Sequence, residues 1–224
     1  MVKAIFFDLF FTLIYPKYSD KNEYDVLGIS AMEWEKYAED NHLYRERALG
    51  NVQTEREIID KIVDIMPYQL NESEKQEILE RREERMKRAL LSVDDTILDT
   101  LRQIHEKGIK IGLISNADLI DSKHWGESTL SKIFDITIFS CNVGMLKPDI
   151  EIYNLAINKL GIMPEDSIFV GDGGSNELWG AKNAGMKTVF TEFLERKSEI
   201  QKEIIEKHAD YHIYKFDKLL NYID

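Results

Sequence analysis

An apolar stretch near the N-terminus, AIFFDLFFTLIYP, contains a single acidic residue, Asp8. A carboxylate at the end of a strand can attack a phosphoryl phosphorus or an alkyl carbon and form a covalent intermediate. A second acid two positions further on would be useful for proton transfer, which is worth roughly 10²–10⁴-fold in rate. Phe10 stands at that position instead. The stretch therefore offers a candidate nucleophile without a neighbouring acid to assist it.

Two other apolar runs also end in polar residues. Ser115 and Asn116 close the run IKIGLISN, and Asp172 closes the run SIFVGD. Neutral donors such as Ser115 and Asn116 can bind phosphate oxygens without adding charge. The carboxylates of Asp8 and Asp172 would suit a hard cation with oxygen ligands, and Mg²⁺ is the ion that we expect.

A lysine and a threonine complete the set of candidate site residues. Lys147 lies in GMLKPD, just before an expected helix that starts at Pro148. A cation here would offset the repulsion between the Asp8 carboxylate and an anionic substrate, about 4 kcal/mol at contact distance and a surface-like dielectric. Thr12 would offer its hydroxyl to a phosphate oxygen.

After Ser92 the sequence alternates between short apolar runs and helical patterns. The expected strands cover residues 2–7, 109–116, 136–141, 167–172 and 187–193, and the expected helices cover residues 94–108, 128–134, 148–161 and 176–185. This alternation predicts an α/β fold with a doubly wound parallel sheet. Ligands of such sheets bind beyond the carboxyl ends of the strands. Asp8, Ser115 and Asp172 are therefore expected to converge on one edge.

Residues 17–92 differ in composition and pattern from the rest of the chain. They are highly charged and carry apolar residues at the three- and four-residue spacing of helices. The helical patterns cover residues 30–49, 54–66 and 71–91. We therefore expect two units, which are an α/β core of residues 1–16 and 93–224 and a helical cap of residues 17–92. The aromatic residues expected to pack inside the cap, rather than contact substrate, are Trp34, Tyr37 and Tyr44.

The composition argues against several classes of partner. The 224 residues carry a formal net charge of −12, whereas binders of nucleic acid or anionic membranes usually show the opposite sign, at least in a patch. The basic residues of segment 81–88 are mixed with glutamates, which we interpret as pairing within one helix. The single cysteine, Cys141, precludes an intrachain disulfide, and no signal peptide or spanning apolar segment is evident. We expect a soluble cytoplasmic protein with no nucleic-acid or membrane partner.

Four motifs, in this order, resemble those of the haloacid dehalogenase-like hydrolase superfamily: FFDLFFTL, LISN, GMLKPD and VGDGGSNELWGAKNAG. The resemblance runs from Met1 to about Phe190. The helical segment that follows the first motif is similar to the cap of the family's subfamily I. The resemblance therefore implies a hydrolase with a Rossmann-like core and an inserted helical cap.

The resemblance also implies a role for each motif residue. Asp8 would be the nucleophile, and Lys147 would be its catalytic partner. The residues implied for phosphate binding are Thr12, Ser115, Asn116 and Lys147. Asp8, Asp172 and the backbone carbonyl of Phe10 would hold Mg²⁺. Glu177 stands five residues after Asp172, where many relatives have a second Asp, and would either bind the metal directly or hold a metal-bound water.

Phe10 is the main departure from the family pattern. In phosphatases of the family this position is an Asp that protonates the leaving alcohol and then activates water, and Phe10 cannot transfer a proton. Phe11 also replaces the usual glycine. We favour a Mg²⁺-dependent phosphatase that forms an aspartyl-phosphate from a small phosphorylated metabolite, and that either uses another acid or accepts good leaving groups.

Two alternatives stay open. The first is dehalogenase or phosphonate chemistry. Dehalogenases of the family carry an aromatic residue at the position of Phe10, but they need no metal and lack the Gly-Asp pair found here at 171–172. Phosphonate hydrolysis would need a cap lysine, for which Lys36 and Lys61 are candidates. The second alternative is a catalytically weak module that binds Mg²⁺ and phosphate. The sequence names neither the substrate nor the oligomeric state.

Overall fold

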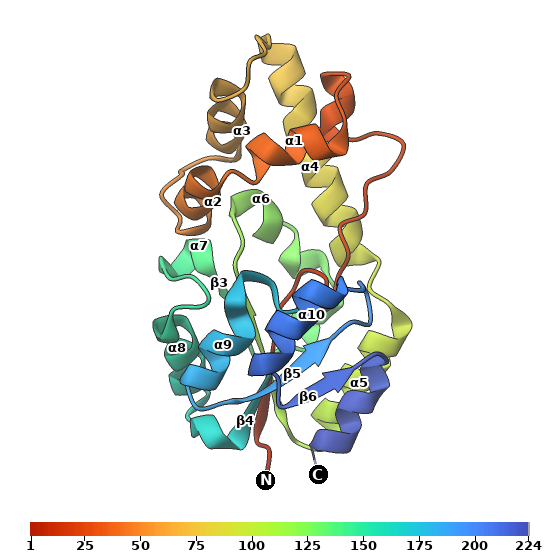
Figure 1. Ribbon diagram of the computed structural model, residues 1–224, viewed down its shortest axis with the longest axis vertical. Coiled ribbons are helices and arrows are strands. Elements are labelled where there is room, and N and C mark those ends of the chain that lie inside the picture. Colours follow the sequence, from red (N-terminus) through yellow and green to blue (C-terminus); the bar gives the residue numbers. More distant parts are fainter. Residues whose placement is uncertain (224) are drawn as a thin grey trace.

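The computed structural model describes residues 1–223. Its centre is a six-stranded sheet in the order β3-β2-β1-β4-β5-β6, in which all neighbouring strands are parallel (Figure 1). The strands are β1 (Ala4–Phe7), β2 (Lys110–Ser115), β3 (Ile136–Phe139), β4 (Ser167–Gly171), β5 (Lys187–Thr191) and β6 (Tyr211–Ile213). The predicted α/β fold is confirmed. The edge strand β6 was not predicted, because its three residues are too few to show a pattern.

Strand β1 is buried on both faces. Successive side chains of a strand point to opposite faces, so Ile5 and Phe7 join one hydrophobic cluster while Ala4 and Phe6 join another. Helix α5 (Asp95–Glu106) packs in the first cluster, and helices α8 (Ile150–Leu160) and α9 (Glu177–Asn183) pack in the second. The next residue, Asp8, therefore lies at the middle of the carboxyl edge of a sheet that is covered on both faces.

The other helical segments of this part of the chain are short. They are α6 (Leu119–Ser122), α7 (Ser140–Val143), α10 (Glu199–Ile205) and 3₁₀ turns at Trp125–Glu127, Leu130–Lys132, Pro164–Asp166, Gly174–Asn176, Glu206–His208 and Phe216–Tyr222. Within residues 1–223, no helix has both the length and the apolar character that a membrane span requires.

Two predicted helices differ from the structure. The predicted helix at 128–134 is wrong, because this segment holds only a 3₁₀ turn and the Ser128 hydroxyl bonds the backbone of Leu90 and Leu130 instead. The helix predicted to start at Pro148 starts at Ile150, because Asp149 is extended and serves as its N-cap residue.

Between β1 and α5 the chain forms a 3₁₀ turn and four helices, and residues 17–92 are called the helical insertion below. The elements are η1 (Glu23–Val26), α1 (Ala31–Ala38), α2 (Asn41–Ala48), α3 (Glu55–Asp64) and α4 (Glu72–Leu91). The single pattern predicted at 30–49 is two helices. Asp40 separates them, because its side chain accepts hydrogen bonds from the N–H groups of His42 and Leu43 and caps α2.

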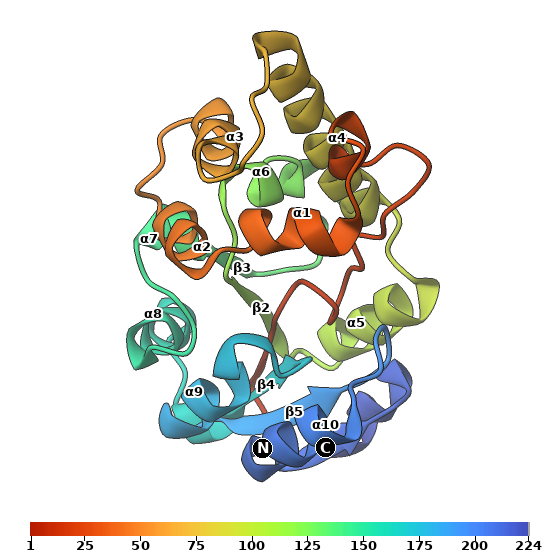
Figure 2. The ribbon, with the colours of Figure 1, turned by 45° about the horizontal axis from the view of Figure 1, so that its top comes forward.

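The helical insertion has its own hydrophobic cluster, which includes Trp34, Ile59 and Ile78. Ile120 of α6 joins this cluster, although α6 follows β2 in the chain. Figures 1 and 2 show α1–α4 at the end of the molecule opposite to the N-terminus, beyond the carboxyl edge of the sheet. The division into a core of residues 1–16 and 93–224 and a cap of residues 17–92 stays a prediction.

The charged residues of α4 do not mainly pair within the helix. Arg81 pairs with Glu77 one turn earlier, as predicted. Three other basic residues of the segment pair outside α4: Arg82 with Asp118 at 2.6 Å, Arg85 with Glu23 at 2.7 Å and Lys87 with Glu127 at 3.2 Å. The interpretation of this run as pairing within one helix is therefore largely wrong, since two of these contacts join α4 to the segment after β2.

Candidate active site

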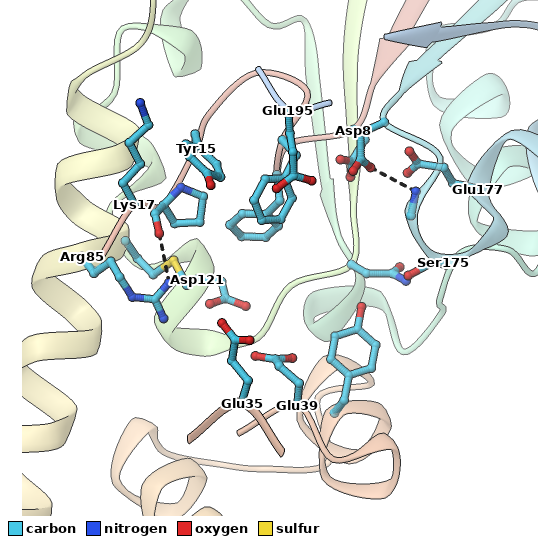
Figure 3. A pocket seen from close by; sticks show the side chains of 18 of the residues that line it. Asp8, Tyr15, Lys17, Glu35, Glu39, Arg85, Asp121, Ser175, Glu177 and Glu195 are labelled. Atoms are coloured by element: carbon cyan, nitrogen blue, oxygen red, sulfur yellow. Dashed lines mark hydrogen bonds between the residues drawn. The ribbon is translucent and has the colours of Figure 1, made fainter. Parts of the chain in front are cut away.

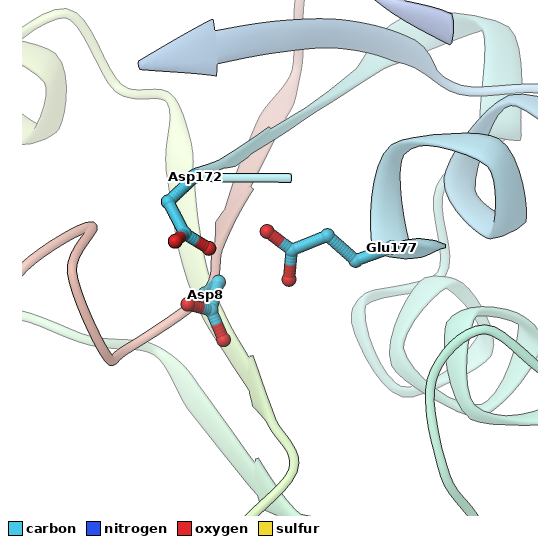
Figure 4. A group of neighbouring side chains, drawn as sticks. All are labelled: Asp8, Asp172 and Glu177. Atoms are coloured by element: carbon cyan, nitrogen blue, oxygen red, sulfur yellow. The ribbon is translucent and has the colours of Figure 1, made fainter. Parts of the chain in front are cut away.

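Three buried carboxylates lie together at the carboxyl edge of the sheet. Asp8 follows β1 and Asp172 follows β4, and these two strands are direct neighbours. Glu177 is the first residue of α9. One oxygen from each of the three side chains lies within 4.8 Å of the other two (Figure 4). Such a group of oxygen ligands has the chemistry that a hard divalent cation requires.

Lys147 supplies a positive charge to this group. Its Nζ contacts Asp8 Oδ1 and lies 2.5 Å from Glu177 Oε2, and its side chain is only 2% exposed. Asn116 fixes the backbone at this point: its Oδ1 accepts from the Lys147 N–H at 2.8 Å, and its Nδ2 donates to the Lys147 carbonyl at 3.0 Å. The segment after β2 thereby positions the lysine that precedes α8.

Burial and neighbouring charges shift the pKa values of Asp8, Glu177 and Lys147. Burial raises the pKa of both Asp8 and Glu177, and the Lys147 ammonium opposes the rise in each case. Burial acts to lower the pKa of Lys147, but the carboxylates of Asp8 and Glu177 outweigh it and raise this pKa above its ordinary value. Lys147 therefore keeps its proton and presents a fixed charge beside Asp8.

The two hydroxyls predicted to bind phosphate are fully buried and do not line the cavity described below. Thr12 Oγ1 donates to Asp8 Oδ2 at 3.3 Å, so it contacts the candidate nucleophile. Ser115 Oγ lies 3.5 Å from the carbonyl oxygen of Asn116. The roles predicted for Thr12, Ser115 and Asn116 in binding phosphate stay predictions.

The loop after Asp8 presents two aromatic side chains to the cavity, Phe10 and Phe11. Phe11 has a φ of +59°, in the left-handed region that costs a residue with a Cβ about 1–2 kcal/mol. Phe11 thus adopts a backbone conformation that favours glycine, although it is not a glycine. The Phe11 ring meets Tyr15 edge-on, with 5.2 Å between the ring centroids. The role of the Phe10 carbonyl as a metal ligand stays a prediction.

A second lysine at the site was not predicted from the sequence. Lys197, on the loop after β5, places Nζ 2.6 Å from Asp172 Oδ2 and 5.5 Å from the centroid of the Phe11 ring. Burial acts to lower the pKa of Lys197, but the Asp172 carboxylate raises it. No spacing marks this residue in the sequence, because it lies beyond the last motif in a charged segment.

A cavity of about 550 Å³ lies between this group and the helical insertion. Figure 3 shows the carboxylates of Asp8 and Glu177 on one side and those of Glu35, Glu39 and Asp121 on the other. Each of these three acids has a partner: Glu35 accepts from Tyr18 at 3.2 Å, Glu39 from Arg47 at 2.9 Å and Asp121 from Arg82 at 3.3 Å. Substrate bound at Asp8 would therefore extend toward the helical insertion.

Of the three aromatic residues predicted to pack inside the cap, two do so and one lines the cavity. Trp34 is 1% exposed and packs inside the insertion, as predicted, and Tyr37 packs against the same cluster. Tyr44 lines the cavity, so the prediction that it only packs is wrong. Neither Lys36 nor Lys61 is among the described residues that line the cavity.

A family model described as haloacid dehalogenase-like hydrolase matches residues 2–185, which include the whole carboxylate group and Lys147. The chain belongs to the haloacid dehalogenase-like hydrolase family. The predicted resemblance is therefore confirmed, and the protein is a hydrolase. The loop that carries Lys197 lies outside the matched segment.

Similar proteins include phosphatases and dehalogenases. The glyceraldehyde 3-phosphate phosphatase of Methanothermobacter thermautotrophicus is 32% identical over 127 residues, which are 55% of this chain and 54% of that protein. The chain thus matches about half the length of this relative.

Solved structures with a similar fold include two enzymes of known source. A HAD family enzyme from Bacteroides thetaiotaomicron, in complex with magnesium and inorganic phosphate, has a TM-score of 0.68 at 21% identity and covers 89% of this chain and 99% of its own. The L-2-haloacid dehalogenase of Xanthobacter autotrophicus has a TM-score of 0.67 at 15% identity, covering 100% of this chain and 98% of its own. At these identities the likeness shows the fold alone.

Proposed function

We propose that this protein is a Mg²⁺-dependent phosphatase that transfers the phosphoryl group of a small phosphorylated metabolite to Asp8 and then to water. The observation that carries the proposal is the position of Asp8, which touches the ammonium of Lys147 and belongs to a group of three carboxylates. The match to a relative named glyceraldehyde 3-phosphate phosphatase supports the substrate class.

In this proposal Asp8, Lys147 and Thr12 have different roles. An oxygen of Asp8 attacks phosphorus, and the bond from phosphorus to the leaving oxygen breaks. Lys147 remains positively charged and offsets the repulsion between the carboxylate and the incoming phosphate. Thr12 and Lys147 each contact one oxygen of Asp8 and hold the carboxylate in place. The helical insertion acts as the cap that excludes water during phosphoryl transfer.

The carboxylate group fits Mg²⁺. Asp8, Asp172 and Glu177 offer oxygen ligands at short mutual distances, and Mg²⁺ is commonly held by one or two carboxylates with substrate phosphate and waters. The bound ion would neutralise charge on the transferred phosphoryl group. This grouping also disfavours the dehalogenase alternative, in which no metal is needed and Asp172 would have no task.

Magnesium binding is expected to stabilise the protein. With Mg²⁺ at about 100 times its Kd, the free energy of unfolding should rise by about 2.7 kcal/mol, which corresponds to an increase in Tm of roughly 5–10 °C for a chain of this size. Thermal unfolding with and without Mg²⁺ measures this shift. Asp172→Asn should lose most of it, whereas Asp99→Asn, which changes an exposed carboxylate paired with Arg102, should keep it. Equal shifts in the two variants would place the ion elsewhere.

The activity itself is tested with a substrate panel. We expect the wild-type protein to release phosphate from phosphate monoesters and to lose at least about tenfold in rate when Mg²⁺ is chelated. The panel pairs p-nitrophenyl phosphate and small metabolite phosphates with 2-chloropropionate and phosphonoacetaldehyde. Halide release without metal would favour the dehalogenase alternative. Binding of a phosphorylated compound with no turnover of any substrate would favour the binding module.

A further inference from the structure

Four carboxylates that line the cavity have no role in the proposed mechanism, and one of them, Glu195, lies on the same side as Asp8 (Figure 3). The acidic residues that line the cavity are Asp8, Asp172 and Glu177 of the carboxylate group, Glu35, Glu39 and Asp121 on the opposite side, and Glu195. Glu195 lies on the loop after β5 and points into the cavity on the same side as Asp8 (Figure 3). Its side chain is 34% exposed, so it is open to the cavity.

Glu195 is linked to the reacting edge by one ammonium group. Its Oε2 lies 2.6 Å from Lys197 Nζ, and the same Nζ lies 2.6 Å from Asp172 Oδ2. Asp172 in turn belongs to the carboxylate group of Asp8. Lys197 also lies over the Phe11 ring. The pair formed by Glu195 and Lys197 therefore borders the loop in which Phe10 replaces the usual proton-transferring acid.

The loop that carries this pair is anchored at both ends. The fully buried Glu192, next after β5, accepts a hydrogen bond from the Lys197 N–H at 2.7 Å through Oε1. Its other oxygen lies 2.8 Å from His212 Nε2 on β6. The segment between Glu192 and Lys197 is thereby closed into a short loop. This closure holds the Glu195 side chain over the cavity.

We propose that Glu195 is the acid–base residue that replaces the missing acid at Phe10, a proposal that rests on the phosphatase function. When the Asp8 oxygen bonds to phosphorus, the bond to the leaving oxygen breaks and the Glu195 carboxylic acid gives that oxygen its proton. In the second step a water oxygen bonds to phosphorus and the bond to Asp8 breaks. The Glu195 carboxylate takes the water proton, which restores both residues. Lys197 stays charged throughout and orients Glu195 by donating a hydrogen bond to its Oε2, which is an ion pair only while Glu195 is ionised.

The other acids of the cavity fit this role less well. Asp8 is the nucleophile, and Asp172 and Glu177 belong to the metal group. Glu35, Glu39 and Asp121 line the side of the cavity opposite Asp8, away from the carboxylate group (Figure 3). Glu195 combines exposure to the cavity with a fixed position beside the carboxylate group.

The test compares Glu195→Gln with wild type on a series of aryl and alkyl phosphates in saturating Mg²⁺. Because proton donation matters most for poor leaving groups, the variant should lose about 10²-fold in kcat on alkyl phosphates and less than about threefold on p-nitrophenyl phosphate. The dependence of log kcat on leaving-group pKa should become steeper. One limb of the pH profile of kcat should also disappear. Glu199→Gln, at an exposed residue of α10 that pairs with Lys202, is the matched control and should behave as wild type.

A second variant separates proton transfer from a structural role. Phe10→Asp in the Glu195→Gln background returns a carboxylate to the family position and should recover at least about tenfold in turnover of alkyl phosphates. An equal loss on aryl and alkyl phosphates in Glu195→Gln, with an unchanged leaving-group dependence, would overturn the proposal for Glu195. Wild-type protein without turnover of any phosphate ester would instead overturn the proposed function itself.

Discussion

Asp8→Asn is expected to abolish turnover, with a loss of at least about 10⁴-fold in kcat on every phosphate ester, because an amide oxygen is a far poorer nucleophile than a carboxylate and the covalent route is closed. Asparagine has nearly the same shape as aspartate, so Thr12 and Lys147 can still contact the side chain. The loss would therefore report on chemistry rather than on packing.

Two measurements accompany this variant. The first is steady-state release of p-nitrophenol and phosphate, with Asp99→Asn as the control for loss of a carboxylate at an exposed site. The second is acid-quenched wild-type protein analysed by intact mass, which should show a fraction carrying one added phosphoryl group that is absent from Asp8→Asn. Retention of more than about one-tenth of wild-type kcat would show that Asp8 is not the nucleophile.

The positions of Asp8 and Asp172 could be predicted from the sequence because they depend on strand ends. Each follows a short apolar run, and parallel strands bring their carboxyl ends to one edge of the sheet. Because β1 and β4 are neighbouring parallel strands, their carboxyl ends bring the two carboxylates together. The same reasoning located Asn116, because β2 lies on the other side of β1.

The partners of Glu177 could not be predicted in this way. Its position depends on the turn before α9, in which Ser175 and Asn176 both have φ values near +50°, at +52° and +53°. Neither residue type requires that conformation, so the sequence does not fix where the carboxylate points. In the structure Glu177 Oε1 accepts from the Gly173 N–H at 3.1 Å while Oε2 faces Lys147. One side chain thus ties the turn to the buried lysine.

Glu195 and Lys197 were missed for a different reason. Both lie in a segment of mixed charge that looks like a solvated loop, and the long-range contacts of Lys197 with Asp172 and of Glu192 with His212 show that it is held against the site. Side-chain contacts between distant segments leave no periodic pattern in a sequence. Residues that act from such a loop are visible only when the fold is known.

Lys147→Met is expected to lower kcat by about 10³-fold, because the ammonium offsets about 4 kcal/mol of repulsion between the nucleophile and substrate at contact distance and each 1.36 kcal/mol is tenfold in rate. Methionine has a similar volume and length, so the buried site stays filled. The control is Lys36→Met, which removes an exposed lysine that does not line the cavity. A loss below about tenfold in Lys147→Met would contradict this role.

The same variant should show a coupled change in stability. Removal of a buried charge partner typically costs about 3–5 kcal/mol, here because Asp8 and Glu177 lose the cation that they share. The pKa values of both acids are already raised by burial, and loss of Lys147 raises them further. When the pKa of a group is higher in the folded state than in the unfolded state, the protein loses folding stability as pH rises. The deficit of Lys147→Met should therefore shrink as the pH falls from neutral and the two acids become protonated.

Magnesium provides the final distinction between a structural and an electrostatic role for Lys147. A divalent cation bound to the carboxylate group replaces part of the missing charge, so Mg²⁺ should restore stability to Lys147→Met more than it adds to wild type. Chemical denaturation at neutral pH, with Mg²⁺ or with a chelator, measures both free energies of unfolding. A deficit that changes with neither pH nor Mg²⁺ would mean that Lys147 matters for packing alone. A deficit that responds to both would show that its charge balances the carboxylates on which the proposed chemistry depends.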